Sequence, residues 1–361
     1  MYELRECFAR AVSLDYASGE ENAIGALDCS LGVNPYGMSN YVVQQLQHIP
    51  LNDVSHYPHI DAIREKIAER FRAVVPISAD NVLMSNGSMD VLRKLNMAVV
   101  GEGGSVMGVE PRFSAYMDDL AYLGARHISY VLTQENNYRF DTDAFLRKYE
   151  KNPGCRMVCI ENPHNPTGQI IPIAEIERIA VAAKKQGVFL TVDEAYGDYM
   201  PLENSAAVLL SKYENVLVAR SFSKGYGMAG IRLGYMLAAK KTADALSKAF
   251  GPFDCNSVGR LLGMSALKDV EFCTRLMNRV KSDKQLILSS LGNLRVAQTS
   301  PTTPIMMLYQ LDTDTDLYRH LLNHGIKAVS GKGFASLSAN SVRMMVCADA
   351  NRQAEILRRI G

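Results

Sequence analysis

The chain has 361 residues and 47% of them are hydrophobic, which is enough for one large domain with a sizeable core and a second, smaller domain. The 39 basic and 38 acidic residues leave a formal net charge of +1, which argues against a protein that binds nucleic acid through a basic surface. Seven cysteines without CxxC spacing indicate reduced thiols, and neither a transmembrane stretch nor a signal peptide is found, so we expect a cytoplasmic protein.

Helical and strand patterns alternate over residues 61–250. Ile63, Ile67 and Phe71 recur on one helical face and predict a helix over 61–75. Apolar strands separated by helices indicate an α/β fold with a mostly parallel sheet that is covered on both faces. The expected strands are 81–85, 105–109, 125–131, 156–160, 188–192, 216–219 and 233–238, and the expected helices between them are 89–99 and 173–186.

The pattern changes near residue 250, where a long helix is followed by a mixture of strands and helices that is typical of a smaller α+β domain. The elements expected here are helices at 265–290, 315–324 and 351–360 and strands at 303–311 and 341–346. We expect three parts of the chain, which are an N-terminal segment that joins the small domain (1–45), a large domain (46–250) and a small C-terminal domain (251–361).

Polar residues follow the ends of several expected strands, at 86–88, 162–168 and 221–224 and at Asp193. Because ligands bind beyond the carboxyl ends of the strands in a parallel sheet, we expect a site at this edge. Lys224 offers an amine that can form a Schiff base with an aldehyde. Asp193 offers a carboxylate that can keep a pyridine nitrogen protonated, so that the ring accepts electrons. This pair indicates pyridoxal 5′-phosphate (PLP) as the cofactor.

Two other motifs are weaker signals. Residues 225–230 fit the GxGxxG pattern of dinucleotide-binding proteins, but they directly follow Lys224 and no acidic residue ends a strand about twenty positions later. His56 and His164 suggest a metal site, yet they have no histidine partner at helical spacing and no carboxylate cluster. We therefore expect no bound metal.

The order of the polar motifs resembles that of fold-type I PLP-dependent aminotransferases of class I/II, and the histidinol-phosphate aminotransferase-like branch is the most similar. The motifs are Asn162-Pro163-His164-Asn165-Pro166-Thr167-Gly168, Asp193-Glu194-Ala195-Tyr196, Ser221-Phe222-Ser223-Lys224 and Arg232. The resemblance extends from Asn34 to Arg343. It implies a fold-type I PLP transferase in which residues 46–250 bind the cofactor.

The resemblance also implies roles for individual residues. Lys224 would form the Schiff base and carry the Cα proton, Asp193 would pair with the pyridine nitrogen, and Tyr196 would bond the phenolic oxygen. These three are the expected catalytic residues. The cofactor-binding residues that it implies are Gly87, Ser88, Met89, Phe113, Asn165, Asp193, Tyr196, Ser221, Ser223, Lys224, Arg232 and, from a second subunit, Tyr57.

The substrate would be held mainly by Arg343, because a guanidinium binds an α-carboxylate through a two-pronged contact. Asn34 and Asn165 complete the substrate-binding set that the resemblance implies. Since Tyr57 would reach the cofactor phosphate of the other subunit, the resemblance further implies a homodimer with shared active sites.

One departure from the family pattern concerns the substrate. Val329 stands where the histidinol-phosphate and threonine-phosphate branches carry an arginine for the substrate phosphate. The stretch 325–334 instead resembles the turn of enzymes that act on free amino acids, with Ser330 in place of proline. Lys327 or Lys332 could offer a positive charge to a phosphate, but a lysine lacks the two-pronged contact of an arginine. We therefore expect a free L-amino acid as the substrate.

The expected reaction is transamination, through an external aldimine and deprotonation of Cα by Lys224. Elimination with ring closure of an arginine-like amino acid, as in enzymes that resemble capreomycidine synthase, is an alternative, and decarboxylation is another. A ligand-sensing regulator is disfavoured, because the chain has no attached DNA-binding module and little net charge.

Overall fold

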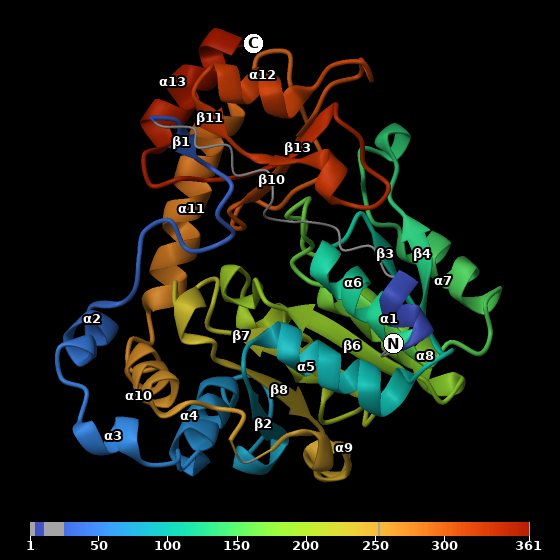
Figure 1. The fold of residues 1–361 in the computed structure, drawn as a ribbon, viewed down its shortest axis with the longest axis vertical. Coiled ribbons are helices and arrows are strands. Elements are labelled where there is room, and N and C mark those ends of the chain that lie inside the picture. The colour runs from blue at the N-terminus through green and yellow to red at the C-terminus, as the bar shows by residue number, and fades with distance from the viewer. Residues whose placement is uncertain (1–3, 11–24, 252, 361) are drawn as a thin grey trace.

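The computed structural model describes residues 4–10, 25–251 and 253–360 and is built around a seven-stranded sheet (Figure 1). The strand order is β2-β8-β7-β6-β5-β3-β4, and all neighbours are parallel except β8, which runs antiparallel to β2 and β7. This confirms the mostly parallel sheet. The strands are β2 (Val82–Ser85), β3 (Ser105–Glu110), β4 (Arg126–Val131), β5 (Met157–Glu161), β6 (Phe189–Glu194), β7 (Val216–Ser221) and β8 (Gly234–Ala238).

Helices cover both faces of this sheet. Along β5, Val158 and Ile160 enter the core on one face, while Met157 and Cys159 enter the core on the other. Alternating side chains are therefore apolar on both sides, which is why the strand reads as a continuous apolar run. The helices of the first face are α4 (Asp61–Phe71), α7 (Thr142–Glu150), α8 (Ile173–Lys185) and α10 (Ser257–Ala266), and those of the second are α5 (Ser88–Leu95), α6 (Ser114–Leu123) and α9 (Lys240–Leu246).

A second group of elements lies above the carboxyl ends of the large sheet in Figure 1. Its antiparallel sheet has the order β12-β13-β10-β9, and β1 pairs with β11 in parallel. The strands are β1 (Leu27–Asp28), β9 (Arg295–Val296), β10 (Ile305–Tyr309), β11 (Ile326–Lys327), β12 (Val329–Ser330) and β13 (Ser341–Met345), and the helices are α11 (Phe272–Leu288), α12 (Leu317–Asn323) and α13 (Ala350–Ile360). The domain limits given above remain predictions.

The predicted long helix over 265–290 is wrong at its start, because α10 ends at Ala266 and α11 begins only at Phe272. Asp269 lies in the break, where its carboxylate accepts a hydrogen bond from Ser39 (2.9 Å) and pairs with Arg275 (2.8 Å). Ser39 is distant in the sequence, and no glycine or proline between Ala266 and Phe272 marks the break.

The N-terminal part contributes three short helices. The first, α1 (Glu6–Arg10), lies on α6, while α2 (Asn40–Leu46) and α3 (Leu51–Ser55) pack against α10. No helix within the described residues is long and apolar enough to cross a membrane.

Candidate active site

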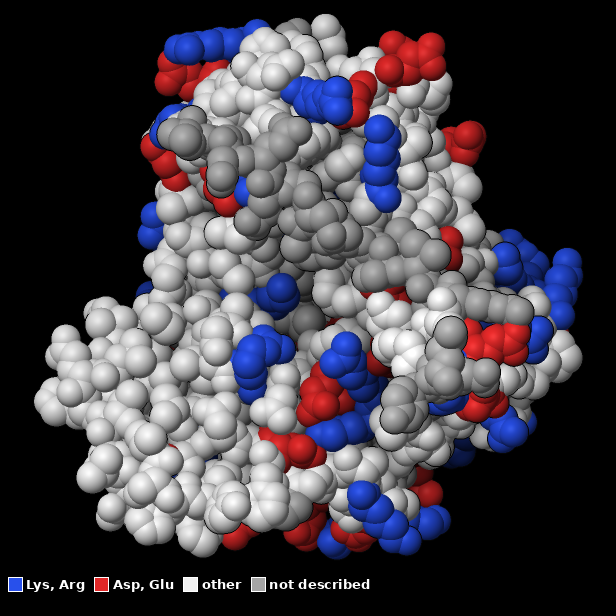
Figure 2. All heavy atoms as spheres, viewed as in Figure 1, with Lys and Arg blue, Asp and Glu red and all other residues white. Residues whose placement is uncertain are grey.

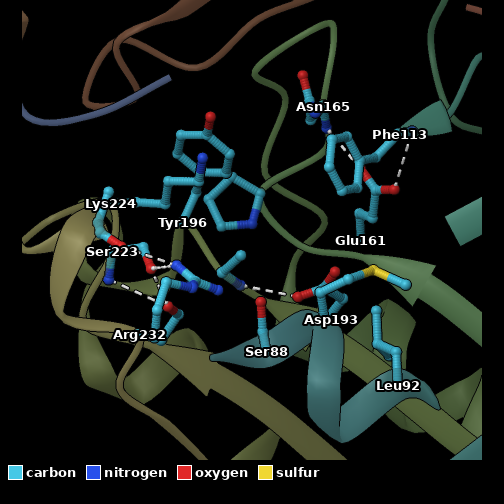
Figure 3. Close-up of a pocket in the computed structure, with 15 residues that line it drawn as sticks. Ser88, Leu92, Phe113, Glu161, Asn165, Asp193, Tyr196, Ser223, Lys224 and Arg232 are labelled. Atoms are coloured by element: carbon cyan, nitrogen blue, oxygen red, sulfur yellow. Dashed lines mark hydrogen bonds between the residues drawn. The ribbon is translucent and has the colours of Figure 1, made fainter. Parts of the chain in front are cut away.

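A pocket lies at the carboxyl ends of β5, β6 and β7 and at the N-terminus of α5 (Figure 3). It brings together most of the residues predicted from the sequence. The lining residues are Ser88, Met89, Leu92, Phe113, Glu161, Pro163, Asn165, Asp193, Ala195, Tyr196, Ser221, Ser223, Lys224, Ala229 and Arg232.

The amine of Lys224 lies beside Tyr196, with Nζ 5.3 Å from the centre of the tyrosine ring. The Tyr196 hydroxyl donates to the carbonyl of Gly32 at 3.2 Å. Burial raises the pKa of Tyr196 to about 12, so the hydroxyl stays protonated at neutral pH. A Cβ on Gly32 would lie 2.6 Å from the tyrosine oxygen and 3.2 Å from Nζ, so the N-terminal segment closes directly over the amine. The sequence reasoning did not select Gly32, although it lies two residues before the Asn34 motif.

Asp193 and Asn165 face the pocket from neighbouring strand ends. Asp193 is 7% exposed and its Oδ1 accepts the N–H of Ala195 at 3.0 Å. Burial raises the pKa of Asp193, while Arg112 and Lys224 oppose this rise. The side-chain oxygen of Asn165 is buried and has no hydrogen-bond partner among the described residues. Both groups suit a polar ligand inside the pocket.

The opposite end of the pocket is an anion cradle, by which we mean Gly87, Ser88, Ser221, Ser223 and Arg232. Gly87 has a φ of 95° and directly precedes α5, whose first N–H groups are free to bind an anion. Ser221 donates to Ser223 at 2.8 Å, and Arg232 donates to the Ser223 hydroxyl at 3.2 Å. A Cβ on Gly87 would lie 2.5 Å from Nη2 of Arg232, so the glycine lets the guanidinium approach the helix start.

The roof of the site comes from the N-terminal segment and β13. Arg343 is fully buried on β13, and its Nη2 donates to the carbonyl of Ser30 at 2.5 Å. Asn34 donates to the carbonyl of Gly225 at 2.7 Å and accepts the N–H of Tyr36 at 2.9 Å. The Asn34 amide thus holds the loop after Lys224, and its contact with a substrate stays a prediction.

Tyr57 does not line this pocket. Its side chain is 75% exposed and packs on Phe253 with ring centres 4.5 Å apart. It follows α2 and α3, over which the surface in Figure 2 is almost free of charged residues. The predicted role of Tyr57 in another subunit remains a prediction.

Two charged residues, one in the pocket wall and one behind it, were not predicted from the sequence. Glu161, 5% exposed, lines the pocket, and Arg112, 1% exposed, lies 3.3 Å from it. Glu161 ends an apolar strand directly before the 162–168 motif, and this position was the signal that the sequence offered.

His164 forms hydrogen bonds with Thr167 and with the carbonyl of Pro111. The described residues contain no cluster of three metal-binding side chains.

Comparisons with known proteins identify the family of the chain. A family model described as aminotransferase class I and II matches residues 27–360. The histidinol-phosphate aminotransferase of Ruminiclostridium cellulolyticum is 26% identical over 90% of this chain and 88% of its own length. Histidinol-phosphate aminotransferase 1 of Cupriavidus pinatubonensis is 30% identical over 79% of this chain and 72% of its own.

Solved structures with the same fold cover the whole chain or nearly all of it. The histidinol-phosphate aminotransferase of Sinorhizobium meliloti, in complex with pyridoxal-5′-phosphate, has a TM-score of 0.80 at 21% identity and covers 100% of this chain and 98% of its own. YbdL from Escherichia coli, described with a methionine aminotransferase function, has a TM-score of 0.86 at 19% identity and covers 99% and 100%. At these identities the likeness shows the fold.

Proposed function

The chain belongs to the class I and II aminotransferase family, and from this we propose that it moves the amino group of a free L-amino acid, with PLP held around Lys224. Because the family and the named relatives are aminotransferases, aminotransfer is favoured over elimination with ring closure and over decarboxylation. The observation that carries the proposal is the meeting of Lys224, Asp193 and the anion cradle in one pocket.

The residues present fit the cofactor at each of its polar ends. The anion cradle offers hydroxyls, helix N–H groups and the Arg232 guanidinium for a phosphate. Asp193 would hold the pyridine nitrogen, and the unpartnered amide oxygen of Asn165 marks a side chain suited to a polar group at the ring edge. Phe113 lines the same pocket and would stack on the ring. When bound, PLP supplies a ring that accepts electrons from the substrate Cα.

The chain's own residues would then bind the substrate and move its proton. Lys224 would take the proton from Cα. The protonated Tyr196 beside it would donate a hydrogen bond to the phenolic oxygen of the cofactor. Arg343 would exchange the carbonyl of Ser30 for the α-carboxylate, because a charged acceptor binds a guanidinium more strongly than a neutral one.

The surroundings of Val329 support a free amino acid as the substrate. Val329 is half-buried and pairs in register with Arg343, so its side chain stands beside the roof of the site without a charge. The nearby Lys332 lies 3.5 Å from Asp316, which offsets its charge. We therefore infer that this chain differs in substrate from the relatives that are named for histidinol phosphate.

A mass-spectrometric screen of free amino acids and histidinol phosphate, with and without a keto-acid acceptor, tests this proposal. We expect repeated conversion of a free amino acid to its keto acid only when an acceptor is present, at most one equivalent per PLP site without it, and no conversion by a Lys224→Ala variant. Preferred use of histidinol phosphate would refute the substrate assignment. Ammonia or carbon dioxide released without an acceptor would refute aminotransfer.

We also propose a homodimer in the cytoplasm. The exposed apolar side chains Tyr41, Val43, Leu46, Leu51, Val54, Tyr57 and Phe253 lie on or beside α2 and α3 and would be covered by a second copy. All seven cysteines lie within the described residues and none is paired in a disulfide, as in a reducing compartment.

A further inference from the structure

Glu161 stands directly beside Asp193 in the sheet. It is the last residue of β5, and its register partner on β6 is Asp193. Both carboxylates are buried and both line the pocket. Charged groups are rarely buried without a partner, so a second carboxylate at this place needs a physical reason.

The two oxygens of Glu161 hold two different segments of the pocket wall. Oε1 accepts the backbone N–H of Phe113 at 3.3 Å, and Oε2 accepts the backbone N–H of Asn165 at 3.1 Å, as the dashed lines in Figure 3 show. Phe113 lies at the start of α6 and Asn165 lies in the loop after β5. One side chain therefore fixes the spacing between an aromatic ring and an amide that both face the pocket.

Arg112 supplies the charge that this carboxylate needs. Its Nε lies 3.3 Å from Oε1 of Glu161, which is its only carboxylate contact among the described residues. Its other nitrogens donate to the carbonyl and Sγ of Cys159, both at 3.0 Å, and its guanidinium lies 3.8 Å from the centre of the Tyr116 ring. These contacts fix the guanidinium behind Glu161.

We propose that Glu161, held by Arg112, is a positioning residue that keeps Phe113 and Asn165 in the arrangement that binds the PLP ring against Asp193. The proposal rests on the proposed function, since it assumes that PLP occupies this pocket. Neither residue of the Glu161–Arg112 pair would touch the reacting atoms. Their effect would pass through the backbone of the two segments that they hold.

The charges that face Glu161 make this arrangement sensitive to pH. Burial raises the pKa of Glu161 to about 7, Arg112 opposes the rise, and Asp193 adds to it. The other charged or titratable groups that line the pocket are Lys224, Tyr196 and Arg232. A protonated Glu161 has a hydroxyl in place of one acceptor, so below about pH 7 it can hold only one of the two N–H groups well.

A Glu161→Gln variant tests the proposal, because an amide keeps one acceptor and turns an NH₂ donor toward the other N–H group. The matched control is Glu194→Gln. Glu194 is equally buried, pairs with Arg220 at 3.2 Å and accepts two hydrogen bonds, but it does not line the pocket. The readouts are the dissociation constant for PLP and the visible absorbance of the bound cofactor against pH.

We expect Glu161→Gln to weaken PLP binding by about tenfold and to shift the pH curve, while Glu194→Gln leaves both within about twofold. Arg112→Lys, a second variant of the same pair, should change both readouts in the same direction. Unchanged affinity and pH curve in Glu161→Gln and Arg112→Lys would overturn the inference, as would equal changes in Glu194→Gln. If the wild-type protein itself failed to bind PLP, the proposed function would fail instead.

Discussion

At the scale of single residues, Gly32 is the position where a side chain would most directly obstruct the site. In Gly32→Ala the new Cβ would lie 2.6 Å from the hydroxyl oxygen of Tyr196 and 3.2 Å from Nζ of Lys224, so one of these groups must move. We expect kcat/KM for the amino acid to fall by about tenfold to a hundredfold, because misplacement of a reacting group is costly. Steady-state kinetics and PLP titration would measure this, and PLP affinity should hardly change.

The matched control is Gly230→Ala, because a Cβ on Gly230 would meet nothing within 4 Å. If both variants kept the wild-type kcat/KM, the close approach of Gly32 to Nζ of Lys224 would not matter for activity.

His164 contributes to the pH dependence of the free energy of unfolding. Its Nε2 lies 2.9 Å from the carbonyl of Pro111 and must donate, so Nδ1 accepts the Thr167 hydroxyl at 2.8 Å and the ring is neutral. Burial lowers the pKa of His164 to about 3. Between pH 6.5 and about 3 the unfolded chain binds the extra proton, so the free energy of unfolding falls by about 1.4 kcal/mol for each pH unit of acidification.

We expect His164→Gln to remove this slope in urea unfolding curves recorded at several pH values. His324→Gln, at an exposed histidine, should keep it. Identical pH dependence in the wild type and in His164→Gln would contradict the neutral, buried ring.

The sequence predicted the residues that carry recognisable chemistry at the strand ends. Lys224, Asp193 and the residues of the anion cradle stand where polar side chains interrupt apolar runs. Glu161 also ends such a run. The sequence does not assign a role to a single glutamate there, because its backbone partners are seen only in the fold. Gly32 becomes meaningful only when the fold places it over Lys224.

At the scale of elements, α11 is fastened to the loop before β10 by a buried lysine. Nζ of Lys284 lies 2.7–2.9 Å from the hydroxyl of Thr299 and from the carbonyls of Ser300, Thr303 and Ile305, so at most three N–H groups are shared among four acceptors. Thr303 in turn donates to the carbonyl of Gly168 at 2.6 Å, at the end of the loop that carries Asn165. Burial lowers the pKa of Lys284, but only a charged amine has three N–H donors for three carbonyls.

Lys284→Met should therefore cost about 1–3 kcal/mol of unfolding free energy, because it removes a buried donor from three carbonyls. The carbonyls of Ser300 and Ile305 keep hydroxyl donors from Thr303 and Thr299, so the carbonyl of Thr303 is the one that loses its donor. Urea denaturation would measure the loss. Lys281→Met on the exposed side of α11 should change the stability by less than about 0.5 kcal/mol. Equal stabilities of the two variants would show that the contacts of Lys284 with these carbonyls make no net contribution to the free energy of unfolding.

Elements with a regular period were predictable, and those set by tertiary contacts were not. The apolar runs of β5, β6 and β7 and the helical stripe of α4 lie where the sequence placed them. The break between α10 and α11 contains Asp269, whose hydrogen bond from the distant Ser39 forms only in the folded chain.

At the scale of the whole molecule, the surface over α2 and α3 is where a second copy would bind. Leu51 is 80% exposed, Val54 is 65% exposed and Tyr57 is 75% exposed. Figure 2 shows almost no charge over α2 and α3. An apolar face of this kind is costly in water and is covered in stable homodimers. Sedimentation should therefore give a dimer, and charged substitutions at Leu51 and Val54 should yield monomers.

A shared active site makes a sharper prediction than dimerisation alone. If Tyr57 serves the pocket of the other subunit, Lys224→Ala and Tyr57→Ala impair different components of each site. A hybrid of one Lys224→Ala and one Tyr57→Ala subunit then has one site with an intact lysine and an intact tyrosine. Because half of randomly paired dimers are hybrids, co-refolding equal amounts should restore about a quarter of the wild-type activity at limiting PLP.

Each variant refolded alone provides the control. If Tyr57 served its own subunit, every site in the hybrid would lack one of the two residues, and mixing would give only the average of the separate activities. Such an average would show that Tyr57 does not serve the cofactor site of the other subunit, without arguing against the dimer itself. The packing of Tyr57 on Phe253, outside its own pocket, favours the restored activity.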